Sequence, residues 1–348
     1  MTSQVRIGLL GTGFVLDEFH MPALAEVGNA KVVSVAGRSQ AKVEAFAKKW
    51  GIPKRYFGAR GMDQLCKDPS VDVVLVALPN DLHLPAITLA AENHKDLICE
   101  KPLARNLREA QRARDVARRY GVIHCYAENQ VFSPQFVRAR GLIENGVIGK
   151  VNWVRSREAH SGPHSRWFWD LKRAGGGVML DMGCHSIEAT RHLFRKAPKS
   201  VSGWTATLVH KTALEDNSLV LVNYEGGGIG NSENSWSARG GVDVRFEVYG
   251  SDGSIFIDTT RETGIRAFTT APKDKTGYIV EKADAKEGWI FPAWQEYVTY
   301  GFLDELRHFV GCLSEGKKPR ETFDDGLIVN SIIDAAYRSA RESRWVDL

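Results

Sequence analysis

The sequence predicts an α/β fold: an N-terminal Rossmann dinucleotide-binding domain, then a C-terminal α+β domain with a large, mostly antiparallel open sheet. A glycine-rich turn directly follows the first apolar strand, strands alternate with helices up to residue 126, and strand-like runs then follow one another from residue 201 to residue 258. Alternating strands and helices are typical of a parallel sheet, whereas consecutive strands are typical of antiparallel pairing. We therefore expect domains at residues 1–126 and 127–348.

The composition excludes several classes of protein. The 348 residues suffice for two domains, and a formal charge of +4 is small for this length. The basic cluster Arg105–Arg119 alternates with apolar residues, as a solvated helix face does, so we expect no nucleic-acid partner. An odd number of cysteines, 5, without a CxxC pair indicates a reducing compartment. Without a signal peptide or a long apolar run, the sequence indicates a cytoplasmic protein with no membrane partner.

The first strand, Val5–Leu10, enters Gly11-Thr12-Gly13, and a helix is expected next. Gly11 permits a tight turn, and Gly13 lets the backbone approach a pyrophosphate. Leu16 stands at the third small position of the usual pattern, so the match is incomplete. We assign the turn, with Phe14 and Val15, to cofactor binding.

The second strand, Lys31–Ala36, ends in Gly37-Arg38-Ser39. A site for NAD usually has an acidic residue here that binds the ribose hydroxyls, whereas Arg38 and Ser39 suit a 2′-phosphate. The sequence therefore favours NADP, with NAD as the alternative. A solvent-facing Arg38 without a ligand is the other interpretation.

The rest of the first domain continues the alternation. The expected helices are 41–50, 85–93 and 107–120, and the expected strands are 71–78, 97–100 and 122–126. The strand ending at Glu100 leads into Lys101 and Pro102, at the edge of a parallel sheet where ligands bind. A lysine there can stabilise charge on a reacting oxygen, although a surface ion pair is the simpler interpretation.

The second domain contains the most unusual segment, residues 158–191. Gly175-Gly176-Gly177 lets the backbone approach another group closely, and a helical pattern follows. Asp181 and His185 are four residues apart, so we place them on one helix face, where the carboxylate can orient the imidazole. An ordinary helix pair is the alternative. No set of residues has credible metal-ligand spacing, so we expect no metal.

The remaining elements of this domain are simple to place. The expected strands are 151–159, 204–209, 218–224, 228–236, 242–249 and 253–258, and the last helices are 297–314 and 324–342. One face of such a sheet can stay open for a partner. We therefore expect a homodimer or homotetramer formed through this sheet.

Several motifs together resemble one family. They are Gly11-Thr12-Gly13, Pro79-Asn80 with His83, Glu100-Lys101-Pro102, Gly175–Gly177 with Asp181 and His185, and Asp324-Asp325-Gly326. Over essentially its whole length the chain resembles the Gfo/Idh/MocA oxidoreductases, the glucose–fructose oxidoreductase and inositol dehydrogenase group. Glu128-Asn129-Gln130 departs from the arginine-containing segment of many relatives.

The resemblance implies site residues. Lys101, Asp181 and His185 correspond to the catalytic set, with Lys101 touching both the nicotinamide ribose and the substrate hydroxyl. The resemblance also implies that Pro79, Asn80 and Glu100 lie along the cofactor. With the residues assigned from the sequence itself, the expected cofactor contacts are Gly11, Gly13, Phe14, Val15, Arg38, Ser39, Leu78, Pro79, Asn80, His83, Glu100, Lys101 and Asn129. For the substrate we add Asn129, His160, His164, Arg166, Trp167 and Trp169 to the catalytic set, with core packing as the alternative for the tryptophans.

These expectations lead to an NAD(P)-dependent dehydrogenase that acts on a secondary alcohol of a sugar, cyclitol or glycoside. His185 is the candidate base, Asp181 orients it, and Lys101 stabilises the developing alkoxide. Two alternatives keep the same fold: an NAD-dependent glycosidase with a retained cofactor, and a non-catalytic dinucleotide-binding regulator. A regulator would not need Lys101, Asp181 and His185, so the presence of all three argues against that alternative.

Overall fold

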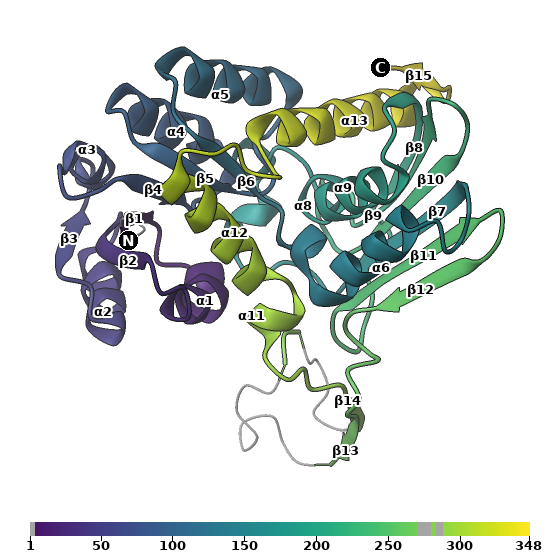
Figure 1. Cartoon of the computed structure of the whole chain (residues 1–348), viewed down its shortest axis with the longest axis horizontal. Coiled ribbons are helices and arrows are strands. Elements are labelled where there is room, and N and C mark those ends of the chain that lie inside the picture. The colour runs from purple at the N-terminus through teal and green to yellow at the C-terminus, as the bar shows by residue number, and fades with distance from the viewer. Residues whose placement is uncertain (1–3, 271–279, 283–287) are drawn as a thin grey trace. The chain divides into compact units, whose positions relative to one another are not determined.

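The computed structural model describes residues 4–270, 280–282 and 288–348. Figure 1 shows the chain as a ribbon. It divides into two compact units. Unit 1 comprises Met1–Asn129, Lys172–Gly175 and Gly301–Asn330, and unit 2 comprises Gln130–Leu171, Gly176–Tyr300 and Ser331–Leu348. The chain therefore returns to unit 1 twice after leaving it.

The core of unit 1 is a parallel sheet. Its strands are β1 (Val5–Leu10), β2 (Ala30–Gly37), β3 (Lys54–Phe57), β4 (Val73–Val76), β5 (Asp96–Glu100) and β6 (His124–Ala127). They lie in the order β3-β2-β1-β4-β5-β6, and every pair is parallel. All four residues of β4 are buried, as expected for a strand covered on both faces. The order reverses between β1 and β4, the position at which such sheets bind ligands.

Helices connect these strands. They are η1 (Leu16–His20, a π-helix), α1 (Met21–Ala25), α2 (Gln40–Trp50), α3 (Gly61–Lys67), η2 (Asn80–Leu82), α4 (His83–Glu92) and α5 (Leu107–Tyr120). A helix from much later in the chain, α12 (Phe302–Glu315), packs against η1, α1 and β1. The sequence fixes both ends of α5, because Asn106 accepts a hydrogen bond from the Glu109 N–H at 3.0 Å and Gly121 adopts a left-handed conformation. The Rossmann fold expected from the sequence is confirmed.

Unit 2 is built on a mixed sheet. Its strands are β7 (Val151–Ala159), β8 (Pro198–Ala206), β9 (Asn217–Tyr224), β10 (Ile229–Ser235), β11 (Asp243–Gly250), β12 (Ser254–Asp258) and β15 (Val346–Asp347). They lie in the order β12-β11-β7-β10-β9-β8-β15. Only β7 and β10 pair in parallel, so the expected mostly antiparallel sheet is confirmed.

Helices and short elements complete the chain. They are η3 (Asn129–Phe132), α6 (Pro134–Glu144), η4 (Arg166–Trp169), α7 (Leu171–Ala174), α8 (Val178–Asp181), α9 (Gly183–Phe194), β13 (Ala267–Thr269), β14 (Gly288–Ile290), α11 (Glu296–Thr299) and α13 (Phe323–Glu342). α9 packs against β7 and β10, and α6 packs against β12. Residues in β9 alternate between buried and partly exposed, so the sheet has one covered face.

Two further observations concern the helices and the cysteines. Within the described residues, every helix is too short or too polar to cross a bilayer. The described cysteines are all free thiols, with Cys312 partly exposed and the others buried. Burial raises the pKa of Cys66 to about 12, which makes this thiol unreactive.

Candidate functional site

The glycine turn after β1 fits a pyrophosphate. Gly11 has φ +121°, and a Cβ there would lie 2.3 Å from the Ala77 carbonyl oxygen, so only glycine fits. A Cβ built on Gly13 meets no described atom within 4 Å, so the backbone is open to a ligand. The Asp17 N–H donates to the Gly13 carbonyl at 3.1 Å and starts η1. Phe14 packs edge-on against Phe19, with ring centroids 5.5 Å apart.

The loop after β2 is exposed and lacks a carboxylate. Arg38 and Ser39 both face solvent. Ser39 caps α2 by accepting a hydrogen bond from the Lys42 N–H at 3.5 Å, so its hydroxyl already has a structural task. Glu44 lies one turn along α2 and accepts from the Gln40 side chain at 2.8 Å. Arg38 is therefore the one charged side chain of the loop itself.

The end of β5 presents Lys101. Glu100 is buried, and one of its carboxylate oxygens lies 2.6 Å from Nε2 of buried His20. Its other oxygen accepts a hydrogen bond from the Lys101 N–H at 3.2 Å. The Lys101–Pro102 peptide bond is cis. The buried Glu100 carboxylate therefore holds the backbone of Lys101 in position.

Buried side chains also fix the end of β4. The His83 ring nitrogens lie 2.9 Å from the Leu78 carbonyl oxygen and 3.0 Å from the Pro102 carbonyl oxygen, and burial lowers the pKa of this imidazole. Asn80, next to Pro79, donates to the Ala174 carbonyl at 2.8 Å. His83 and Asn80, both expected cofactor contacts, therefore hold backbone in place. Asn129, another expected cofactor contact, is buried at the start of η3.

The three glycines approach the chain itself closely. A Cβ on Gly175 would lie 2.5 Å from that of Arg105. A Cβ on Gly177 would lie 2.2 Å from the Glu215 carbonyl oxygen. The Glu215 carboxylate accepts hydrogen bonds from the Gly177 N–H at 2.9 Å and from the Tyr337 hydroxyl at 2.6 Å. The sequence motif indicated close packing but not these partners.

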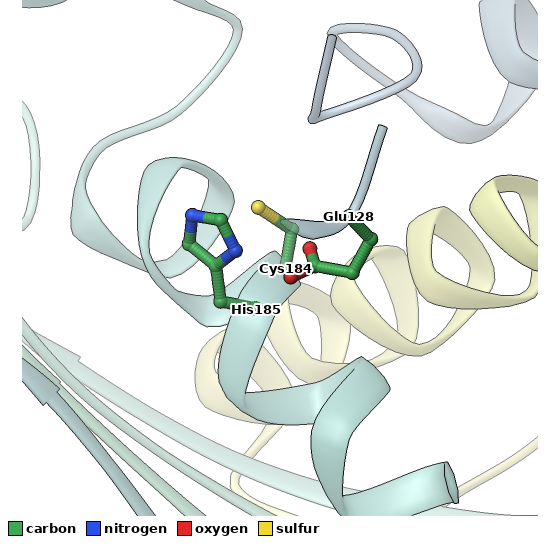
Figure 2. A group of neighbouring side chains, drawn as sticks. All are labelled: Glu128, Cys184 and His185. Atoms are coloured by element: carbon green, nitrogen blue, oxygen red, sulfur yellow. The ribbon is translucent and has the colours of Figure 1, made fainter. Parts of the chain in front are cut away.

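Asp181 and His185 follow this turn in unit 2. The expectation of one continuous helix needs correction, because α8 ends at Asp181 and α9 starts at Gly183, with Met182 between them. Both side chains are buried. The Trp236 indole N–H donates to the Asp181 carboxylate at 3.1 Å and fixes that group. Figure 2 shows His185 beside Cys184 at the start of α9.

His160 marks a second group of titratable residues in unit 2. Its Nδ1 accepts a hydrogen bond from the Gly162 N–H at 2.9 Å, so Nε2 carries the proton of the neutral ring. Burial lowers the pKa of His160 to about 4, opposed by the nearby charge of Asp181. This imidazole is therefore neutral at physiological pH and can donate a hydrogen bond from Nε2.

Two residues that the sequence analysis missed hold the His160 segment. Nε2 of His164 lies 2.7 Å from the Glu281 carboxylate. Burial alone would raise the pKa of Glu281, but the hydrogen bond with His164 and nearby positive charge lower it below its usual value. The Lys282 ammonium donates to the Gly162 carbonyl oxygen. Glu281 and Lys282 belong to no recognisable motif, so nothing in the local sequence indicated them.

The aromatic residues of η4 differ in their surroundings. Trp169 packs against Trp236, with ring centroids 5.1 Å apart, so core packing takes part of this ring. Trp167 is stacked on Phe168 and is only partly buried. Arg166 is exposed. Arg166 is therefore the residue of η4 most open to a ligand.

The parallel sheet and the glycine turn together define a dinucleotide-binding protein of the Rossmann class. The chain belongs to the Gfo/Idh/MocA oxidoreductases: residues 5–128 match the model described as "Oxidoreductase family, NAD-binding Rossmann fold", and residues 136–256 match the GFO/IDH/MocA C-terminal domain. The resemblance inferred from the motifs is thus confirmed.

Curated relatives match over nearly their whole length. Myo-inositol 2-dehydrogenase of Thermotoga maritima is 28% identical, covering 99% of this chain and 98% of the relative. Scyllo-inositol 2-dehydrogenase (NAD(+)) of Bacillus subtilis is 29% identical, covering 100% and 97%. Among solved structures, GenD2 from gentamicin A biosynthesis, in complex with NAD, superposes with a TM-score of 0.91 at 28% identity, covering 100% of this chain and 97% of that one.

Proposed function

We propose that this oxidoreductase transfers a hydride between a secondary alcohol of a sugar, cyclitol or glycoside and a nicotinamide cofactor. The single observation that carries the proposal is the end of β5, where Lys101 directly follows a carboxylate hydrogen-bonded to the helix that leaves the glycine turn. A lysine fixed beside a dinucleotide turn suits a reacting hydroxyl group. The names of the inositol dehydrogenase relatives support the substrate class.

The chain's own residues would handle the proton. When bound, the nicotinamide ring supplies the hydride acceptor. Lys101 donates a hydrogen bond to the hydroxyl oxygen and stabilises the negative charge that develops there. His185 removes the hydroxyl proton as general base, and Asp181, itself held by Trp236, supports the protonated imidazole. Neutral His160 donates a hydrogen bond to a second substrate hydroxyl.

Further substrate contacts come from the same segment of unit 2 and from the end of β6. His164 and Arg166 offer hydrogen-bond donors, Trp167 offers an aromatic face, and Asn129 offers an amide. Sugars and cyclitols combine ring C–H groups with hydroxyls, so they suit a set that contains both kinds of contact. Glu281 and Lys282 would hold this segment in the conformation that binds substrate.

For the cofactor, we propose that Arg38 selects NADP over NAD. The loop from Gly37 to Ser39 contains a guanidinium and no carboxylate to bind two ribose hydroxyls. A guanidinium pairs well with a phosphate and stacks on an adenine. Since the B. subtilis relative and GenD2 carry NAD in their names, NAD is the competing cofactor.

A screen tests the function directly. Sugars, cyclitols and glycosides are offered with NAD and with NADP, and reduced nicotinamide is followed by its absorbance. We expect at least one polyol to support turnover that is lost in Lys101→Ala. Release of a free sugar without net cofactor reduction would instead identify the glycosidase alternative. Cofactor binding without turnover on any member of the panel would favour the regulator.

We also propose that the uncovered face of the unit 2 sheet joins two copies of the chain. Trp153 and Phe256 are 43% and 69% exposed on β7 and β12, and Tyr249 packs against both rings from β11 between them. A continuous exposed aromatic patch is typical of an interface. Light scattering should give a multiple of the chain mass, reduced by Phe256→Glu. A monomeric wild-type protein would rule out this interface.

A further inference from the structure

His20 joins two parts of unit 1 that carry the proposed cofactor and catalytic groups. It is the last residue of η1, the π-helix that begins just after the glycine turn. Its side chain is fully buried, and its ring meets the edge of Phe302 with centroids 5.2 Å apart. The 2.6 Å contact from Nε2 to the Glu100 carboxylate is a short, charge-assisted hydrogen bond. One side chain thus ties η1 to the end of β5.

Glu100 is also hydrogen-bonded to the peptide of Lys101. While one carboxylate oxygen is bonded to His20, the other accepts from the Lys101 N–H at 3.2 Å. On the far side of Lys101, the carbonyl oxygen of Pro102 lies 3.0 Å from Nδ1 of His83. Lys101 therefore stands between two residues, each held by a buried histidine.

A second buried acidic residue, Glu305, lies near Glu100 but does not replace it as the hydrogen-bond partner of His20. Glu305 on α12 is fully buried, and neither of its carboxylate oxygens has a hydrogen-bond partner among the described residues. Burial, together with the charges of Glu100, Glu128 and Glu321, raises the pKa of Glu305 well above its usual value. The raised pKa favours the neutral form of Glu305, which adds no negative charge beside Glu100. It also supplies a matched control, because glutamine closely resembles a protonated glutamic acid.

We infer that His20 is a positioning residue for the reaction. Through its hydrogen bond with Glu100, it links η1, the helix after the glycine turn, to the peptide of Lys101 and so holds that peptide in place. This inference rests on the proposed function and deepens it, because it names a residue that touches neither substrate nor cofactor. Displacing a catalytic group by as little as about 1 Å can cost on the order of 100-fold in rate. A shift of the Lys101 backbone would therefore lower kcat more than it weakens cofactor binding.

The test is a double-mutant cycle between His20 and Lys101. His20→Met keeps the approximate volume but removes the hydrogen bond, and His20→Gln keeps a donor near the position of Nε2. We expect His20→Met to lower kcat about 10- to 100-fold, with cofactor Kd changed less than about threefold. His20→Gln should recover most of the rate, and Glu305→Gln should match wild type. In a Lys101→Ala background, His20→Met should lower kcat no further, because the two residues act as one unit.

The outcomes separate the inference from the function on which it rests. A merely structural His20 would lower the melting temperature in the Met and Gln variants alike, and its effect on kcat would add to that of Lys101→Ala. Additive effects, or a Gln variant no faster than the Met variant, would overturn the inference while leaving the dehydrogenase intact. A wild-type protein that binds cofactor but turns over no alcohol overturns both.

Discussion

The end of β5 in unit 1 and the segment from His160 to Trp169 in unit 2 carry the two halves of the proposed chemistry, and they are held in different ways. Around Lys101, the supporting groups are buried and contact backbone: the His83 ring nitrogens lie near two carbonyl oxygens, and Asn80 donates to a third. Around His164, support comes from side chains in a distant part of the sequence, and the imidazole stays 35% exposed. If the proposed function holds, rigid support for the cofactor residues combined with replaceable support for the substrate residues would let one fold serve many alcohols.

The largest expected effect tests the rigid half. Lys101→Ala should lower kcat at least about 100-fold, because a fixed charge at the reacting oxygen contributes on that scale. Cofactor Kd, measured by nicotinamide fluorescence, should stay within a few-fold of wild type. Lys67→Ala is the control, since Lys67 is an exposed lysine of α3 paired with Asp63. Unchanged turnover in Lys101→Ala would show that Lys101 is only a charged residue at the end of β5 with no role in the reaction.

His185→Asn tests whether the base belongs to the substrate half. We expect kcat to fall on the order of 100-fold and the activity to lose its dependence on a group that titrates near neutrality. The comparison variant is His160→Asn. The activity of His160→Asn should still depend on a group that titrates near neutrality, because the pKa of His160 is about 4 and its ring does not titrate near neutral pH. If this dependence disappears in His160→Asn and survives in His185→Asn, then His160 is the base and His185 is not.

Arg38→Ala asks whether cofactor choice resides in a single exposed side chain. Loss of a charge-assisted pair worth about 1.5–3 kcal/mol would weaken NADP binding roughly 10- to 100-fold and leave NAD almost untouched. Titration of both cofactors against wild type and variant provides the measurement, with Arg119→Ala on α5 as an exposed control. Tighter binding of NAD than of NADP to the wild-type protein would contradict the assignment.

Glu281→Gln addresses the side-chain support of the substrate half. A partly exposed ion pair contributes at most about 1 kcal/mol, so we expect KM to rise about two- to fivefold with kcat nearly unchanged. Glu247→Gln removes a comparable pair with Arg155, whose atoms are 3.0 Å apart, from the sheet and should leave KM unaltered. Equal KM values in all three proteins would show that Glu281 does not support the substrate half.

The stability of the folded protein should also depend on pH, through His160. The pKa of His160 is about 4 when folded, below its usual value of 6.5, so the unfolded chain binds the proton first as the pH falls. Stability is therefore full above about pH 6.5 and is lost toward pH 4, by up to about 1.4 kcal/mol per pH unit. Denaturant titrations over this interval should show a shallower loss in His160→Asn than in wild type. Parallel curves would mean that His160 does not stay neutral in the folded protein.

How far the sequence predicted this molecule depends on where each contact comes from. Both sheets, the glycine turn and the limits of α5 follow from local patterns: apolar runs, Asn106 and Gly121 at the helix ends, and Gly11 at its turn. The helix break at Met182, the pairing of β7 with β10 and the partners of the three glycines depend on residues far apart in the chain. Local periodicity carries no information about such partners.

The same limit applies to the candidate site. Lys101 lies in a short motif, so its position could be predicted, whereas Glu281 and Lys282 meet His164 and Gly162 from over a hundred residues away. His83 and Asn80 also lie in motifs, yet their side chains bond to backbone. A motif identifies a residue that matters without saying whether it contacts ligand or chain.

Because α12 belongs to unit 1, the order of synthesis matters for this protein. Phe302 stacks on Phe19 with centroids 4.8 Å apart, and Asn330 donates to the Ala104 carbonyl at 3.0 Å. A nascent chain that has emerged only to Asn129 still lacks these contacts, although domains generally begin to fold from the N-terminus during translation. The Rossmann unit is completed only after strands β7 to β12 of the mixed sheet have been made. A fragment cut at Asn129, or a chimera joined there, would expose Phe19 and should aggregate, whereas a chimera that also transfers Gly301–Asn330 should not.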